Sequence, residues 1–580
     1  MSTFRIQQVL EFQILFPDEI PMSPVEYMKG GGRDVILKSA LFLLSLKPDS
    51  TREKDNQIFL SKFFSNENNH FARYVANRIQ TLENEGMFVL INNPLTSLKL
   101  FEYFFSKDED EKTQSDVDFE INLFKAYLVL NSEFARVQQK AFSSTEGLES
   151  EFQLSMMMFC AEYPSSDKTN FDIKQIWGTQ MIKSVYLFNF LESNSVTKPL
   201  LDAFLLSFDK PNWQEYLKGL LPLASPIVLG EIKGQTDLVI KPDVNFEKNC
   251  AFIEKLVIKE VDVLEEFDYI ALRSKPFFKI EEGVYRIIFN LFVVEKIFKG
   301  AYFFLNKIND ELPEAQRISE FRSFYGFEFS EKILAYNVLD SIFSKCKIRF
   351  NGQELSKLKI EGEPDYYVHN GNNIFIFESK DFLIKAINKE SFDYNIYCEE
   401  FKRILYFEKK PNNKIKKKAI LQIVNNIKRV LMNDFIADTD YHYKDIIIYP
   451  ILIVHDHQYD TLGFNTLLNN WFKFELKKLE DEGFFIHHIK PLTVINIDSL
   501  IYFQAALTED VTLNKVIDSY HDFVERIKMN PLFNSQQNES LMMSKNMPFG
   551  YFIDDFFGKR GIRKVPHLFK FVRDLLFVDN

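Results

Sequence analysis

The spacing of hydrophobic residues changes near the middle of the chain and divides it into a helical part and a mixed part. In the first part apolar residues recur at helical spacing, as in 121–130 and 200–208. After this helical part, two short apolar runs within 277–289 flank a Glu-Glu-Gly turn and predict a β-hairpin. We therefore predict a mainly helical region of unknown role over 1–274, and a connector of hairpin and helix over 275–320.

After the connector, strands and helices are expected to alternate. A helix should begin near Gly326, with Ser330 as its N-cap, because the apolar residues that follow repeat at three and four. Pro450 cannot donate to a sheet ladder and must lie at a bulge, a break or a strand edge. The predicted strands are 347–350, 366–369, 373–377, 445–454 and 492–497, and the predicted helical segments are 381–406 and 415–432. This order predicts an α/β domain over 321–505, with a central mixed sheet flanked by helices, and a helical extension over 506–580.

The most informative stretch, 361–380, predicts a hairpin that carries charged side chains. Asn370-Gly371 is typical of a two-residue type I′ turn. If these two residues form the loop, Asp365 pairs with Ile376 and becomes a diagonal neighbour of Glu378, about 7–8 Å away between backbones, and Glu363 lies opposite Glu378. Side chains alternate along a strand, so Glu378 and Lys380 share that face. A three-residue loop would move Asp365 to the other face.

Two carboxylates on one face are close enough to hold a cation between them. The arrangement Pro364-Asp365, a gap, then Glu378-Ser-Lys380 resembles the PD-(D/E)XK nuclease superfamily, over roughly 324–500. The resemblance implies that Asp365 and Glu378 bind Mg²⁺, with Mn²⁺ as an alternative, and that Lys380 positions or activates the attacking water. A bound cation would lower the pKa of Lys380. The implied activity is hydrolysis of phosphodiester bonds in nucleic acid, with DNA favoured, in restriction or anti-phage defence.

The same resemblance implies two further site residues. Glu331 on the first helix would be a third metal ligand, with Glu328 as a weaker choice, and Gln422 on the helix after the basic stretch would point at the active site. An acid in the first turn of a helix also serves as a capping or dipole residue, and a glutamine is also an ordinary surface side chain. Both alternatives stay open.

A basic stretch follows the hairpin and is expected either to contact phosphates or to form a solvated loop. A polyanion at the metal site needs cations nearby, which favours phosphate contact. The lysines concerned are Lys410, Lys414, Lys416, Lys417 and Lys418.

Composition narrows the class of protein. At 580 residues the chain exceeds one ordinary domain, and 46% hydrophobic with 26% charged residues are globular values. A net charge of −12 argues against coating nucleic acid over the whole surface, but not against a local basic patch. The four cysteines form no C-x-x-C pair, which fits a reducing cytoplasm. Neither a signal peptide, nor an apolar run of spanning length, nor a P-loop motif is found. No membrane role is expected.

Three alternatives bear on this interpretation. His455 and His457, like His487-His488, are expected in surface loops rather than in a metal site. The protein is alternatively a catalytically inactive nuclease fold that serves as a nucleic-acid-binding or assembly module, or a helical scaffold in which 374–377 is not a strand. The helical region 1–274 is expected to recognise substrate, a protein partner or a second copy of the chain.

Overall fold

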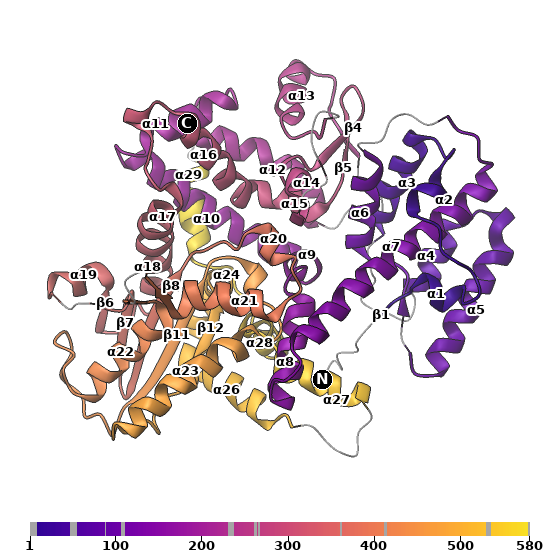
Figure 1. Ribbon diagram of the computed structural model, residues 1–580. Coiled ribbons are helices and arrows are strands. Elements are labelled where there is room, and N and C mark those ends of the chain that lie inside the picture. Colours follow the sequence, from indigo (N-terminus) through magenta and orange to yellow (C-terminus); the bar gives the residue numbers. More distant parts are fainter. Residues whose placement is uncertain are drawn as a thin grey trace. The chain divides into compact units, whose positions relative to one another are not determined.

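The computed structural model describes residues 8–46, 55–87, 89–105, 111–229, 237–259, 264, 267–359, 362–410, 414–528 and 535–577. The chain divides into two compact units (Figure 1). Unit 1 comprises Met1–Ser143 and Gly219–Lys296, and unit 2 comprises Ser144–Lys218 and Ile297–Asn580. This division differs from the boundaries expected from the sequence, because helices of 144–218 pack with the second half of the chain.

Unit 1 is mainly helical and has a core rich in phenylalanine. Phe64 and Phe124, for example, have ring centroids 5.3 Å apart. The predicted hairpin near residue 280 is present as β4 (Phe277–Glu281) and β5 (Val284–Ile287), joined to β3 (Asp237–Val239) in the order β3-β5-β4. A parallel pair, β1 (Gln8–Val9) and β2 (Val89–Leu90), lies elsewhere in the unit. Its longer helices are α3 (Arg33–Ser45), α4 (Asp55–Phe63), α5 (Asn69–Asn84), α6 (Pro94–Phe105), most of α7 (Asp116–Ser144) and α13 (Phe246–Glu254).

Unit 2 is built on a mixed five-stranded sheet of order β12-β11-β8-β7-β6 (Figure 1). The strands are β6 (Ile348–Asn351), β7 (Tyr366–Asn370), β8 (Asn373–Lys380), β11 (Ile447–Val454) and β12 (Thr493–Asn496). Strands β8, β11 and β12 are parallel, whereas β6 and β7 continue the sheet antiparallel. All five predicted strands are therefore confirmed, and with them an α/β core.

Pro450 lies at a break in a ladder, as predicted. It pairs with Ile376 of β8 on one side, while the ladder from β11 to β12 begins one residue later, with Ile451 opposite Thr493. The missing N–H therefore faces a position where no bond to β12 is needed.

Helices cover both faces of the sheet. On one face, the ring of Phe343 packs on Phe375 and Phe377 of β8, with centroids 5.2 and 5.8 Å away. Phe343 follows the helical pair η6 (Tyr325–Ala335), a π-helix, and α18 (Tyr336–Ile342). On the other face, α22 (Ala419–Leu431) packs on β8 and β11 and against α23 (Phe464–Asp481). These two layers hold the ends of β8 between them.

The remaining helices of unit 2 surround this core. They include α8 (Ser150–Glu162), α10 (Ile173–Ser193), α11 (Lys198–Ser207), α16 (Lys299–Glu311), α17 (Phe321–Phe324), α19 (Gly352–Lys357), α20 (Ala386–Lys389), α21 (Tyr394–Phe401), the π-helix η7 (Lys402–Tyr406), α24 (Ile497–Tyr502), α25 (Gln504–Glu509), α26 (Leu513–Arg526), α27 (Ser535–Lys545), α28 (Phe549–Lys559) and α29 (Leu568–Leu576). α12 (Trp213–Leu229) runs from unit 2 into unit 1.

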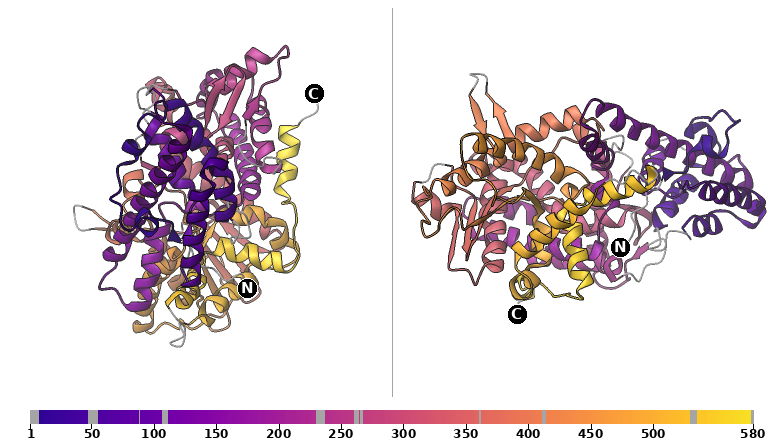
Figure 2. Two further views of the ribbon diagram at one scale, coloured as in Figure 1. Left: turned by 90° about the vertical axis from the view of Figure 1, so that its right-hand side faces the viewer. Right: turned by 90° about the horizontal axis from the view of Figure 1, so that it is seen from below.

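Three local predictions are wrong. The segment 381–406 is not helical throughout, because residues 381–385 and 390–393 lie outside α20, α21 and η7. Ser330 is not an N-cap, because it lies inside η6, where its hydroxyl donates to Asp381 Oδ2 at 2.5 Å. The helix expected over 415–432 begins only at Ala419. Its first residues instead form β10 (Ile415–Lys417), which pairs antiparallel with β9 (Phe407–Lys409) in a two-stranded ribbon that projects from the unit (Figure 2).

Candidate active site

The register of the central hairpin differs from the expected one, yet it keeps the expected face. Asn370 pairs with Asn373 and Tyr366 with Phe377, so the two loop residues are Gly371 and Asn372 rather than Asn370 and Gly371. Gly371 has φ +62°, a left-handed conformation that glycine adopts without strain. The next position along the register sets Asp365 directly opposite Glu378. The predicted diagonal placement of Asp365, and of Glu363 opposite Glu378, is therefore wrong.

The structure brings Asp365, Glu378 and Lys380 together. Lys380 Nζ lies 3.2 Å from Asp365 Oδ2 and 3.0 Å from Glu378 Oε2. The backbone N–H of Ser379 donates to the same Asp365 oxygen at 2.7 Å. The Glu378 side chain is fully buried, whereas that of Lys380 is 25% exposed. One ammonium thus joins two carboxylates at the carboxyl end of β8, on a side that solvent reaches.

Burial and mutual repulsion set the charges of this cluster. Burial, followed by the charge of Asp365, raises the pKa of Glu378 well above its usual value. Burial acts to lower the pKa of Lys380, but the carboxylates of Asp365, Glu378 and Glu331 outweigh it and raise that pKa. A lowered pKa of Lys380 was expected beside a bound cation. In the metal-free protein the pKa of Lys380 is instead raised, so its side chain is a charged ammonium.

Glu331 belongs to the same electrostatic group. It lies on η6, and the hydroxyl of Tyr336 donates to its Oε1 at 3.2 Å. Burial first, and the charge of Asp365 second, raise the pKa of Glu331 to about 8. Glu328, the weaker choice from the sequence, instead forms an ion pair of 2.7 Å with Lys332.

The donor set fits a hard divalent cation only in part. Among the described residues, no three His, Cys, Asp or Glu side chains are grouped closely enough to hold a metal ion by themselves. Magnesium is, however, commonly held by one or two carboxylates together with water and substrate phosphate. Glu378 Oε1 is buried and accepts no hydrogen bond within the described part of the chain. This free oxygen, with Asp365, is what such a cation would bind.

Among the described residues, the structure shows no hydrogen bond between Gln422 and the carboxylate cluster. Gln422 is half-buried on α22, and its side chain makes no hydrogen bond to another described residue. One turn further, Asn426 is fully buried and donates to the carbonyls of Gly362 and Gln422, each at 3.0 Å. Asn426 therefore anchors the segment that leads to Asp365. The sequence offered little signal for this role, since an asparagine in a helix is usually a surface residue.

The predicted basic residues lie on the projecting ribbon and at its base. Lys410, Lys414, Lys416 and Lys417 are exposed. Lys418 instead forms an ion pair of 3.0 Å with Glu408. None of the five contacts the carboxylate cluster within the described residues, so the ribbon is a separate basic surface.

The two histidines after β11 are buried, and their prediction as surface residues is wrong. His455 is 8% exposed, and its Nε2 lies 2.7 Å from Ser379 Oγ. Burial lowers the pKa of His455 to about 4, so the ring is neutral. His457 is also 8% exposed and contacts the Asp167 carbonyl at 3.1 Å. His487 and His488, in contrast, are exposed as predicted.

Comparisons with known proteins leave the site as the basis for function. No helix within the described ranges combines the length and the apolar character needed to cross a bilayer. No protein-family model, no curated protein and no solved structure matches this chain.

Proposed function

We propose that this protein is a metal-dependent nuclease of the PD-(D/E)XK type that hydrolyses phosphodiester bonds of nucleic acid, with DNA as the favoured substrate. The observation that carries the proposal is the meeting of Asp365, Glu378 and Lys380 at the end of β8, where Lys380 Nζ lies 3.2 Å from Asp365 Oδ2 and 3.0 Å from Glu378 Oε2. A five-stranded mixed sheet with helices on both faces supports it.

Asp365 and Glu378 would hold the cation. Glu331, whose raised pKa keeps it mostly protonated near neutral pH in the metal-free protein, would lose its proton beside a bound cation. Bound Mg²⁺ supplies charge neutralisation at the phosphate and lowers the pKa of bound water. The chain's own residues do the positioning. The N–H of Ser379 fixes Asp365, and burial restricts the Glu378 side chain.

Lys380 contributes a positive charge and hydrogen-bond donors. Because its pKa is raised, it acts as an ammonium that binds a phosphate oxygen or orients the attacking water, rather than as a base. Its partial exposure allows it to turn from the carboxylates toward a substrate phosphate. The lysines of the ribbon would contact the backbone farther along the strand.

The test is cleavage of a mixed panel of labelled DNA and RNA in Mg²⁺, in Mn²⁺ and in EDTA. Lys380→Ala is compared with the wild type and with Lys385→Ala, an exposed lysine five residues along. We expect metal-dependent cutting that is lost in Lys380→Ala and kept in Lys385→Ala. Cutting in EDTA, or cutting that survives in Lys380→Ala, would contradict the proposal. Binding without cutting, unaffected by Lys380→Ala, would favour the alternative of an inactive binding or assembly module.

A further inference from the structure

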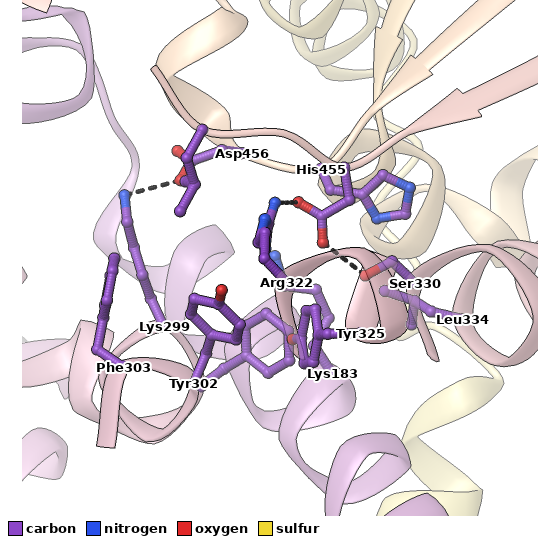
Figure 3. A pocket seen from close by; sticks show the side chains of 13 residues that line it. Lys183, Lys299, Tyr302, Phe303, Arg322, Tyr325, Ser330, Leu334, His455 and Asp456 are labelled. Carbon is purple, nitrogen blue, oxygen red and sulfur yellow. Dashed lines mark hydrogen bonds and ion pairs between the residues drawn. The ribbon is translucent and has the colours of Figure 1, made fainter. Parts of the chain in front are cut away.

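A second feature of unit 2 is a pocket at the carboxyl ends of β8 and β11, where Asp381 and His455 follow these strands (Figure 3). Residues of α16 and η6 form other parts of its wall, among them Tyr302, Phe303 and Tyr325. The cavity is small, about 40 Å³, and the empty space between its walls reaches about 430 Å³ when counted out to open solvent. The pocket therefore has room for one edge of a planar ring, while the rest of the ring stays at the pocket mouth.

The pocket and the carboxylate cluster share two chain segments. Asp381 directly follows Lys380, and Ser330 directly precedes Glu331. Lys380 and Asp381 are joined by one peptide bond, so their Cα atoms are about 3.8 Å apart and the two sites lie on opposite sides of the same short stretch of backbone. A nucleic acid strand with a phosphate at the cluster thus has a neighbouring nucleotide within reach of the pocket.

The cations of the pocket are already matched by acids. Arg322 is paired with Asp381. Lys299 Nζ lies 2.8 Å from Asp456 Oδ2. Lys183 Nζ lies 2.7 Å from Asp498 Oδ1. Three cations against three carboxylates leave no net charge to attract a free phosphate. The pocket is instead polar and electrically balanced, which suits a neutral ligand.

Two buried donors in the wall have no partner. The hydroxyl of Tyr325 makes no hydrogen bond within the described residues, although this side chain is only 4% exposed. Nε of Arg322 is buried and, among the described residues, unpaired as well. A buried polar group without a partner is destabilising, so a ligand that supplies acceptors at these atoms is stabilised.

Aromatic rings complete the recognition surface. Phe303 lines the pocket and is 51% exposed, so one side of its ring is open to a ligand. The guanidinium of Arg322 lies 5.1 Å from the centroid of the Tyr302 ring. Exposed rings beside hydrogen-bonding groups are the features that bind unpaired bases by stacking and by contacts to their edges.

We propose that this pocket binds one unpaired nucleobase of the substrate strand, next to the phosphodiester that is cut. The base stacks on Phe303 at the mouth, and its polar edge meets the Tyr325 hydroxyl and Arg322 Nε. This inference rests on the proposed nuclease function for the place of the phosphate. The inference also names the substrate class. A base within a duplex is stacked and paired, so the substrate must be a single strand, an overhang or a duplex with one base turned out of the helix.

The test measures binding and cleavage separately. Binding of a short labelled single strand to wild-type protein is measured by fluorescence anisotropy in EDTA, with an abasic residue moved along the strand and with the matching duplex. The variants are Phe303→Ala, Tyr325→Phe and, as a control, Phe474→Ala, which removes a phenylalanine that is 60% exposed on α23.

We expect one abasic position to weaken binding by roughly 5- to 150-fold, the value of one stacked base. Phe303→Ala should weaken binding of the intact strand to a similar degree, but not that of the strand abasic at this position. Phe474→Ala should change neither. Equal binding at all abasic positions, equal loss for intact and abasic strands in Phe303→Ala, or no binding of any strand would overturn the inference. An effect of Tyr325→Phe without an abasic effect would mean that the pocket holds only water.

Cleavage of the same strands in Mg²⁺ separates the two proposals. A base-dependent pattern without any cutting would contradict the nuclease and retain the base pocket. Cutting that is equal for all abasic positions would retain the nuclease and reject the base pocket.

Discussion

Asp365 is held across the hairpin by Ser379, whose backbone N–H donates to its Oδ2 at 2.7 Å. The same oxygen lies 3.2 Å from Lys380 Nζ. A main-chain donor does not change rotamer, so the carboxylate keeps its place beside Lys380 even when the ammonium moves. The position of Asp365 is thereby part of the fold, whereas its charge is available for chemistry.

Replacing this charge should separate folding from activity. In Asp365→Asn the amide oxygen still accepts from Ser379, but the negative charge is gone. We expect cleavage to fall by at least about 100-fold, as for removal of one electrostatic group from an active site, with little change in thermal stability. Cleavage rates and thermal unfolding are measured together, and Asp434→Asn, an exposed aspartate, is the control. Unchanged cleavage in Asp365→Asn would contradict the assigned role.

The stability of the metal-free protein should depend on Glu331. Its pKa is raised from 4.5 to about 8 on folding, so the folded state holds a proton that the unfolded state releases. The stabilisation is complete below pH 4.5 and is lost as pH rises toward 8, at up to about 1.4 kcal/mol per pH unit. Glu331→Gln should remove the part of this decline that Glu331 contributes, so the stability of the variant should fall less steeply with pH. Urea unfolding in EDTA at several pH values measures it, and parallel curves for both proteins would refute the prediction.

The basic ribbon should govern the salt dependence of binding. Lys416→Ala/Lys417→Ala removes two exposed cations. Each phosphate that is then no longer neutralised should reduce the slope of log affinity against log salt by about 0.9 for duplex DNA or about 0.7 for a single strand. Binding titrations at several salt concentrations measure the slope. Lys515→Ala/Lys570→Ala removes the same charge elsewhere, from exposed positions, and should leave the slope unchanged. Equal slopes for both double variants would mean that the ribbon is only solvated.

Asn426 should matter for both stability and activity. Asn426→Ala leaves the carbonyl of Gly362 without its buried amide donor, and we expect the free energy of unfolding to fall by about 1–3 kcal/mol. Cleavage should fall by more than the increase in unfolded protein explains. The reason is that Gly362 belongs to the segment that positions Asp365, so losing its hydrogen bond displaces a residue of the active site. Chemical unfolding and cleavage are compared with Asn425→Ala, in which the wild-type side chain accepts a hydrogen bond from Lys417 at the surface. A variant as active as the control would show that the segment does not depend on Asn426.

The sequence predicted the strands of unit 2 because each is a short apolar run between turn residues. It predicted the face shared by Asp365, Glu378 and Lys380 as well, although with the wrong loop. Moving the loop from Asn370-Gly371 to Gly371-Asn372 shifts the register by two positions, and a shift of two preserves which side chains share a face. The chemistry of the hairpin was therefore predictable even where its pairing was not.

Other features depend on contacts between distant segments. The burial of His455 follows from packing against Ser379, 76 residues away, and no local pattern encodes it. The π-helical form of η6 also escapes detection, because an apolar repeat at three and four predicts an ordinary helix. The pocket required α10, α16 and η6 to be placed together, which the spacing of residues within one segment does not determine.

The alternation at the end of β8 also has a consequence for how substitutions combine. Glu378 and Lys380 belong to the carboxylate cluster. Ser379 and Asp381 lie on the other side of the backbone, where Ser379 contacts His455 and Asp381 contacts Ser330 and Arg322 of the pocket. Four successive residues of one segment thus belong to two sites, the carboxylate cluster and the pocket. A displacement of the backbone at one site therefore moves side chains of the other. Free-energy changes from substitutions in the two sites should therefore be non-additive, and a double-mutant cycle would measure their coupling.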